Sequence, residues 1–235
     1  MLDPIQKIFP NMLWRLAKLP SAYGKHSLQI NVLLVLTLFS LVFDISAKAQ
    51  THDIQIIALG NSLIAGYGLS KSEAFPSRLS AALNDKGIPT KIVNAGVSGD
   101  TTSGALQRLD WLLDRPFKLA IIELGANDAL RAVPPAITRR NLEIIILKLK
   151  ATGARILLAG MKAPRNLGPD FAGKFDPIFP ELAKSHDLHF YPFFLDGVAA
   201  KPNLNQEDGM HPNSKGIGII VERILPFVMQ ALGKE

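Results

Sequence analysis

Short apolar runs alternate with amphipathic stretches along most of the chain. Five of the runs are rich in Ile, Val and Leu on both faces and end in Gly, Asn or Pro, which is typical of buried parallel strands. These runs are Ile54–Leu59, Lys91–Asn94, Leu119–Leu124, Arg155–Gly160 and the weaker Leu188–Tyr191. Helical periodicity marks the stretches Ala74–Asp85, Ser103–Leu113, Pro134–Ala151, Phe175–Lys184 and Asn213–Leu232. The alternation predicts an α/β fold, a three-layer αβα sandwich with a central, mostly parallel five-stranded sheet.

The amino-terminal segment has a different pattern. Residues 32–43 read VLLVLTLFSLVF and are closely followed by Ala-Lys-Ala at 47–49, with basic residues upstream. A basic region, a short apolar run and small residues at a cleavage site predict a signal peptide over residues 1–49, cleaved after Ala49. The apolar run is shorter than the roughly 20 residues that span a bilayer, so cleavage is favoured over an uncleaved anchor. Both alternatives export residues 50–235, which we expect to form one domain.

Composition and charge narrow the classes of function. The 235 residues include no cysteine, which excludes disulfides, thiolate metal sites and cysteine nucleophiles. The formal net charge is +6, but residues 1–49 supply +3 of it, from five Lys or Arg against two Asp. The remaining charges are scattered in sign, without a basic stripe interleaved with aromatic residues. We therefore expect no nucleic-acid partner, and membrane contact at most through the amino-terminal segment.

Polar, glycine-rich loops follow three of the predicted strands, and one more precedes the last helix. They contain Gly60-Asn61-Ser62-Leu63, Asn94–Thr101, Gly125–Asp128 and Asp208–Pro212. In a parallel α/β sheet, functional residues gather at the carboxyl ends of the strands. The sequence therefore predicts a site at this edge.

The residue types in these loops are those of an acyl-transfer site. Ser62 lies at a strand-to-helix turn, so its hydroxyl can project into the crevice as a nucleophile. His211 can remove the hydroxyl proton, and Asp208, three residues earlier, can orient the imidazole. The side-chain amide of Asn127 and the backbone N–H groups of Gly99 and Ser62 can stabilise an oxyanion.

Each of these residues taken alone has a structural explanation. A serine after a strand often caps a helix, and Asn127 or Asp208 is equally common in turns. Their combination, in this order and at one edge of the sheet, favours catalysis. His186 and His189 have no third ligand at a metal-binding spacing, so no metal is assigned.

The four blocks resemble those of the SGNH (GDSL) hydrolases, a family named after its Ser, Gly, Asn and His residues. The matching residues are Gly60-Asn61-Ser62-Leu63, Gly99, Asn127 and Asp208-x-x-His211. The similarity is closest to the periplasmic branch with acyl-CoA thioesterase I, lysophospholipase L1 and arylesterase activities, and it covers essentially all of the chain after the signal peptide. It implies an SGNH hydrolase fold, which is flavodoxin-like, over residues 50–235, and a periplasmic location.

The resemblance also implies roles for individual residues. Ser62 is the implied nucleophile, with His211 as the base and Asp208 as its orienting acid. Ser62, Gly99 and Asn127 are the implied oxyanion hole. Enzymes of this kind hydrolyse esters and thioesters through an acyl-enzyme, without a metal or an organic cofactor.

Position 61 departs from the family pattern. An Asp usually precedes the nucleophile, whereas this chain has Asn61. The amide keeps the shape and an acceptor oxygen but loses the negative charge, so we expect a changed rate or pH profile rather than inactivity. Position 64 is Ile, so the Gly-x-Ser-x-Gly elbow of the α/β hydrolases is absent.

The expected substrate is a small-molecule acyl ester or a lysophospholipid. Apolar loop residues, namely Leu130, Val133, Ala163 and Pro164, favour an acyl chain and are the predicted substrate-binding residues. Export separates the enzyme from cytoplasmic acyl-CoA, so thioesterase activity is expected to be a side activity. The alternatives are a carbohydrate O-acetylesterase and a non-catalytic lipid- or glycan-binding module of the same fold. The sequence leaves the oligomeric state open.

Overall fold

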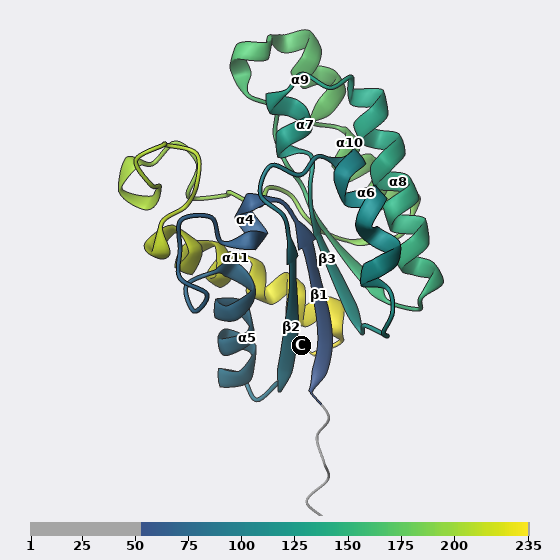
Figure 1. Ribbon diagram of the computed structural model, residues 1–235, viewed down its shortest axis with the longest axis vertical. Helices are drawn as coiled ribbons and strands as arrows, with labels where there is room; N and C mark the ends of the chain where they lie inside the picture. Colours follow the sequence, from purple (N-terminus) through teal and green to yellow (C-terminus); the bar gives the residue numbers. More distant parts are fainter. Residues whose placement is uncertain (1–52, 235) are drawn as a thin grey trace, which may run out of the picture. The chain divides into compact units, whose positions relative to one another are not determined.

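The sheet at the centre of the molecule is built from five parallel strands. The computed structural model describes residues 53–234, so the predicted signal peptide and its cleavage site lie outside the described residues. The strands are β1 (Ile54–Gly60), β2 (Thr90–Gly96), β3 (Leu119–Glu123), β4 (Arg155–Ala159) and β5 (His189–Tyr191). They follow the order β2-β1-β3-β4-β5, and every neighbouring pair is parallel. Figure 1 shows β2, β1 and β3 side by side. All five predicted strands are present, and the sheet is parallel throughout.

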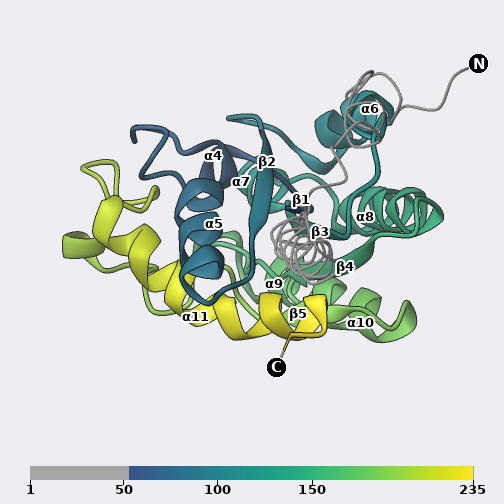
Figure 2. The same cartoon turned by 90° about the horizontal axis from the view of Figure 1, so that it is seen from below.

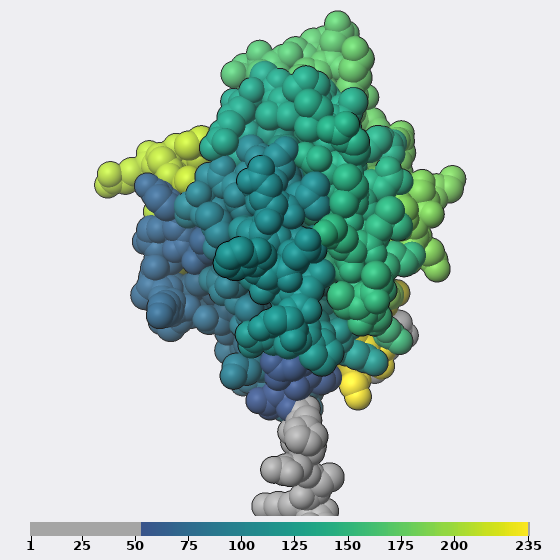
Figure 3. Space-filling view, turned by 45° about the vertical axis from the view of Figure 1, so that its right-hand side comes forward, coloured from purple at the N-terminus to yellow at the C-terminus, as the bar shows by residue number. Residues whose placement is uncertain are grey.

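Helices cover both faces of the sheet, as the alternation predicts. On one face α5 (Phe75–Asp85) packs against the long carboxyl-terminal helix α11 (Ser214–Leu232) (Figure 2). On the other face α6 (Thr102–Leu112) packs against α8 (Pro135–Ala151), and the two lie side by side on the outer surface (Figure 3). A shorter helix, α10 (Ile178–Ser185), contacts α8 and β4. The fold is therefore a three-layer α/β sandwich.

Several short helical segments lie in the loops and were not expected from periodicity. They are α4 (Ser62–Ala65), α7 (Ala126–Leu130), α9 (Pro169–Phe175) and the 3-10 turns η1 (Arg165–Leu167) and η2 (Pro202–Leu204). The predicted helix over Phe175–Lys184 corresponds to α10, which begins three residues later, at Ile178, because Phe175 belongs to the end of α9. Asp176 and Pro177 keep helical backbone angles between the two helices, but Pro177 has no N–H to continue the helical hydrogen bonds.

The register of the strands brings the predicted site loops to one level. Gly60 at the end of β1 pairs with Gly96 of β2 and with Glu123 of β3, and Glu123 pairs in turn with Ala159 of β4. Ala159 pairs with Tyr191 of β5, so all five strands end together at one edge. Every residue of β3 and the last five residues of β1 are buried, so this edge rests on a rigid apolar core. Between residues 53 and 234, no helix combines the length and the apolar composition needed to cross a membrane.

Candidate active site

The turn after β1 presents Ser62 at the edge of the sheet. Ser62 is the first residue of α4, and Asn61 caps this helix, its Oδ1 accepting a hydrogen bond of 2.9 Å from the N–H of Leu63. The residue before them must be small, because a Cβ on Gly60 would lie 2.7 Å from the carbonyl oxygen of Glu123. A Cβ on Gly96 would lie 2.2 Å from the nitrogen of Ala65. The nucleophile turn is therefore held tightly against β2 and β3.

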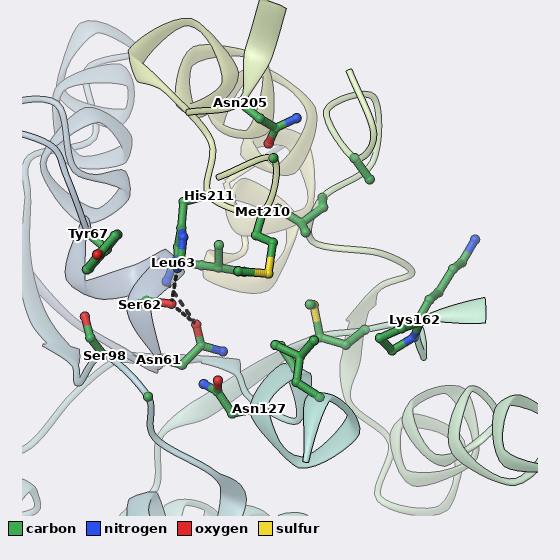
Figure 4. A pocket seen from close by; sticks show the side chains of 18 of the residues that line it. Asn61, Ser62, Leu63, Tyr67, Ser98, Asn127, Lys162, Asn205, Met210 and His211 are labelled. Carbon is green, nitrogen blue, oxygen red and sulfur yellow. Dashed lines mark hydrogen bonds between the residues drawn. The ribbon is translucent and has the colours of Figure 1, made fainter. Parts of the chain in front are cut away.

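Ser62 is hydrogen-bonded to a histidine 149 residues further along the chain. The Oγ of Ser62 lies 2.9 Å from Nε2 of His211 (Figure 4). The other ring nitrogen of His211, Nδ1, lies 2.6 Å from Oδ2 of Asp208. When Nδ1 carries the proton it donates to the carboxylate, and Nε2 is then able to accept the serine proton. The structure thus brings together the three predicted catalytic residues in one hydrogen-bond chain.

Backbone N–H groups of its own loop hold the carboxylate of Asp208 in place. Its Oδ1 accepts hydrogen bonds from the N–H groups of Met210 and His211, each 2.9 Å long. The backbone N–H of His211, its side chain and the N–H of Met210 together lower the pKa of Asp208 to about 2. Hydrogen bonds of this kind favour the charged form of a carboxyl group. Asp208 is therefore ionised at neutral pH and orients the imidazole as a charged partner.

The three predicted oxyanion donors surround the same space. Gly99 and Asn127 line the cavity that holds Ser62. The Nδ2 of Asn127 donates to the carbonyl oxygen of Asp100 at 2.8 Å, which orients the amide and leaves its second hydrogen available. The carbonyl oxygen of Gly99 accepts from Arg131 at 2.9 Å. Within residues 53–234, the N–H groups of Ser62 and Gly99 donate no hydrogen bond, as expected for donors kept for a ligand.

A cavity of about 590 Å³ opens beside Ser62 (Figure 4). Apolar side chains make up most of its lining, among them Leu63, Leu130, Met161, Pro164, Leu195 and Met210. Its polar lining also includes Ser98, Asn205 and Lys162, and Nζ of Lys162 lies 5.0 Å from the centre of the Phe193 ring. This volume and lining are typical of sites for small, largely apolar ligands.

The structure divides the four predicted substrate-binding residues. Leu130 and Pro164 line the cavity, whereas Val133 and Ala163 do not. The side chain of Ala163 is buried in the core and its N–H donates to a carboxylate oxygen of Asp176 at 2.8 Å. Val133 is held in the connection between α7 and α8. Both follow cavity residues closely in sequence, but their side chains face elsewhere.

Sequence reasoning missed the aromatic residue next to the histidine. The ring of Tyr67 lies 4.5 Å from the ring of His211, tilted by 36°. The signal was an aromatic residue between two glycines, Gly66 and Gly68, shortly after the nucleophile. Met210 was also missed, although it lies in the predicted catalytic loop beside His211. Both side chains are more than half exposed and lie at the rim of the cavity.

A buried carboxyl group lies behind the nucleophile turn. The Oε1 of Glu123 accepts a 3.0 Å hydrogen bond from Nδ2 of Asn61, and its Oε2 accepts a longer one of 3.4 Å from the Asn61 N–H. Glu123 is fully buried, and the burial raises its pKa to about 8 although both hydrogen bonds oppose the shift.

Among residues 53–234, no three His, Asp or Glu side chains come close enough to ligate a metal ion.

The chain is similar to known hydrolases over most of its length. The profile of the GDSL-like lipase/acylhydrolase family matches residues 58–217. An arylesterase of Vibrio mimicus is 38% identical over 203 residues, which cover 86% of this chain and 98% of that protein. Thioesterase 1/protease 1/lysophospholipase L1 of Escherichia coli K12 is 42% identical over 168 residues, covering 71% of this chain and 78% of that protein. The crystal structure of AlinE4, an SGNH-hydrolase family esterase, is 45% identical with a TM-score of 0.66 and covers 78% of this chain and 99% of that one.

Proposed function

The chain belongs to the GDSL-like lipase/acylhydrolase family and is a carboxylic ester hydrolase, and within that activity we propose that Ser62, His211 and Asp208 are its catalytic residues. The observation that carries this assignment is the continuous hydrogen-bond chain from Asp208 through His211 to Ser62, which ends at the cavity. A serine hydroxyl is a weak nucleophile unless a base takes its proton, and this chain supplies the base and orients it.

In the first step, Oγ of Ser62 attacks the carbonyl carbon of the ester or thioester while Nε2 of His211 takes its proton. The negative charge of Asp208, whose pKa is lowered to about 2, stabilises the imidazolium that forms. His211 then gives the proton to the leaving alcohol or thiol, and the acyl group stays on Ser62. A water molecule deprotonated by His211 releases the acid and restores the serine.

The tetrahedral intermediates carry a negative oxygen that needs donors. The N–H groups of Ser62 and Gly99 and the Nδ2 of Asn127 are the proposed oxyanion hole. Support for this role comes from their common position in the cavity lining and from the bond between Asn127 and the carbonyl of Asp100, which fixes the direction of the amide. Donors that are already oriented before the reaction lose no reorganisation energy during it.

The acyl portion of the substrate is proposed to lie in the apolar cavity, with medium or long chains preferred over acetyl. Leu130, Met161 and Leu195 offer a surface that a hydrocarbon chain covers better than a sugar would. The signal-peptide pattern in residues 1–49 supports export to the periplasm, where lysophospholipids and other envelope esters are the substrates within reach. Thioesterase activity is then a secondary capacity of the same site.

The test is hydrolysis of p-nitrophenyl esters from acetyl to palmitoyl by residues 50–235, with Ser62→Ala as the control. Turnover that needs Ser62 and peaks at medium or long chains is the expected result. Turnover confined to the acetyl ester would overturn the proposed acyl preference in favour of carbohydrate deacetylation. Turnover that survives in Ser62→Ala would overturn the catalytic assignment. Determining the amino-terminal residue of the protein recovered from the periplasm tests cleavage after Ala49.

A further inference from the structure

Glu123 is a buried carboxyl group for which the proposed mechanism has no use. It ends β3, in register with Gly60 of β1, directly behind the turn that carries Ser62. An unpaired buried carboxylate is costly, and neighbours normally compensate it with a cation. Here both of its oxygens are instead bonded to a single residue, Asn61. A costly group with this one partner calls for a specific role.

The hydrogen bonds give the Asn61 amide a direction. Its Nδ2 donates to Oε1 of Glu123 at 3.0 Å, so its Oδ1 must point the opposite way. On that side Oδ1 accepts from the N–H of Leu63 at 2.9 Å and lies 3.4 Å from Oγ of Ser62 (Figure 4). Rotating the amide by half a turn would place Nδ2 against the N–H of Leu63, donor against donor. Glu123 therefore selects the rotamer that caps α4 and places an acceptor beside the nucleophile.

We propose that Glu123 is a positioning residue: its ionised carboxylate holds the Asn61 amide so that Oδ1 caps the start of α4 and thereby fixes the position of Ser62. The inference rests on the proposed role of Ser62 as the nucleophile. Glu123 touches neither the substrate nor the reacting atoms, and it acts only through Asn61.

The proposal makes activity depend on the protonation of Glu123. A proton on Oε2 turns that oxygen into a donor, so its bond with the Asn61 N–H is lost, and the bond from Nδ2 to Oε1 loses the negative charge that strengthens it. Burial raises the pKa of Glu123 to about 8, which brings this change into the working range of the enzyme. The wild-type kcat is therefore expected to rise with pH as Glu123 loses its proton.

No other charged group in the described part of the chain pairs with Glu123. On α6 and the loop before it, Arg108 bonds Asp100 at 2.7 Å and reaches the backbone carbonyl of Gly60 at 3.2 Å. Asp128 of α7 accepts from Thr102 instead. Because these groups are bonded to other partners, the hydrogen bonds to the Glu123 carboxylate come from Asn61.

The departure from the family pattern at position 61 has a physical meaning in this arrangement. An Asp at 61 would place two carboxyl oxygens about as close as the 3.0 Å bond now present, and the pair would have to share one proton. In Asn61 the hydrogen between the two side chains is part of the amide group, so the Asn61–Glu123 pair is hydrogen-bonded without binding a proton from solution. Exchanging the residue should therefore reverse the sign of the pH dependence.

The experiment measures kcat and KM from pH 6 to 10 in the protein of residues 50–235 and in the variants Glu123→Gln, Asn61→Asp and Asn61→Asp/Glu123→Gln. In Glu123→Gln an amide N–H faces an Asn61 donor, so kcat is expected to fall at least about fivefold at pH 9 with KM little changed, since small displacements of reacting groups cost rate. The rise in kcat near pH 8 that is expected of the wild-type enzyme should be absent in Glu123→Gln. In Asn61→Asp, kcat falls instead of rising as the pair loses its shared proton.

The double variant exchanges the amide and the carboxylate. The amide introduced at position 123 would donate to the new carboxylate at 61 and accept from the N–H of that residue, so kcat is expected to recover to within about threefold of wild type, the interaction that a double-mutant cycle isolates. Glu143→Gln on α8, the same change of atoms at a carboxylate bonded to His186 outside the site, is the control and should leave kcat and its pH profile unchanged.

Two results would overturn the proposal. One is a Glu123→Gln variant with the wild-type kcat and pH profile, and the other is a double variant no more active than Glu123→Gln alone. A merely structural role predicts a lower melting temperature or fewer active sites by burst titration, with an unchanged pH profile in the remaining enzyme. Loss of activity in Ser62→Ala together with an unaffected Glu123→Gln would reject the positioning role and leave the proposed function intact.

Discussion

The ring of Tyr67 packs against the ring of His211, with the two centroids 4.5 Å apart and the planes tilted by 36°. Tyr67 belongs to the loop after α4, whereas His211 belongs to the loop before α11, so the contact joins the segment of the proposed nucleophile to the proposed base. It restrains the imidazole on a side that neither Asp208 nor Ser62 reaches. The contact adds an apolar restraint to a polar catalytic chain.

Removing this ring should loosen the base. Aromatic pairs contribute about 0.5–1.5 kcal/mol, so Tyr67→Ala is expected to lower kcat by roughly two- to tenfold. Tyr67→Phe keeps the ring and should stay within about twofold of wild type, because the contact with His211 is through the ring face. Steady-state kinetics of the two variants on one ester provide the comparison. Equal losses in both would assign the effect to the hydroxyl rather than to packing.

Asp208 is expected to act through the tautomer of His211. Asp208→Asn keeps the shape of the side chain but presents a neutral amide to Nδ1, and loss of the orienting carboxylate in such a triad lowers kcat by about 10⁴. Exchange of Ser62 or His211 for Ala should cost a similar or larger factor. Single-turnover measurements separate acylation from product release. A decrease of less than about tenfold in Asp208→Asn would contradict its role as the orienting acid.

Asn127 is expected to stabilise the transition state without binding the ground state. Asn127→Ala removes one oxyanion donor, for which kcat falls by roughly 10² to 10³ with a smaller change in KM. The bond from Asn127 to the carbonyl of Asp100 also disappears, so circular dichroism and a melting curve accompany the kinetics as a folding control. An unchanged kcat in the folded variant would remove Asn127 from the proposed oxyanion hole.

The cavity should set the preferred chain length. Leu195 lines the cavity and packs against the core, so Leu195→Trp reduces the volume open to an acyl chain. The optimum on the p-nitrophenyl ester series is expected to move to shorter chains, with at least about a tenfold loss on the longest ester, the scale of misfitting a pocket by more than one methylene. Leu147→Trp on the exposed side of α8 is the matched control. The same profile in both variants would place the acyl chain elsewhere.

Glu123 should also leave a signature in stability. The pKa of this carboxyl is about 8 in the folded protein against an ordinary value of 4.5, so between these values the folded chain holds a proton that the unfolded chain has released. The free energy of unfolding therefore falls as pH rises through this window and levels off above it. Glu123→Gln lacks this contribution. The melting temperature of the variant relative to wild type should increase from pH 5 to pH 9, and a constant difference would contradict the raised pKa.

The meeting of the proposed catalytic residues was predictable because chemistry restricts their types and the fold restricts their places. Ser62, Asn127 and His211 each follow or precede an element whose apolar pattern is clear, and parallel strands that end in register must bring such loops together. The family resemblance then distinguished them from ordinary caps. The strands were predictable for a similar reason, since a run that is apolar on both faces fits a covered parallel sheet.

The features that the sequence did not predict depend on how loops and strands pack, and the periodicity of apolar residues carries no information on that packing. The break between α9 and α10 follows from a single proline at 177, which an apolar helical pattern on both sides concealed. Ala163 and Pro164 are adjacent, yet one side chain enters the core and the other the cavity, which depends on backbone direction in a loop. The contact of Glu123 with Asn61 joins the end of β3 to the turn after β1, and it is visible only once the register of these two strands is known.

Gly60 lies two residues before Ser62 in the same motif, but it is required for folding rather than for the reaction. Any side chain there would collide with the backbone oxygen that ends the neighbouring strand. In a saturation screen scored by colour on an ester plate, positions 60 and 62 would give the same blank colonies. A western blot of the soluble fraction would distinguish the two sets of variants. Variants at position 62 are expected to accumulate as soluble, inactive protein, whereas variants at position 60 are expected to misfold and leave the soluble fraction. The same motif thus carries two requirements, one for a reaction and one for the spacing of two strands.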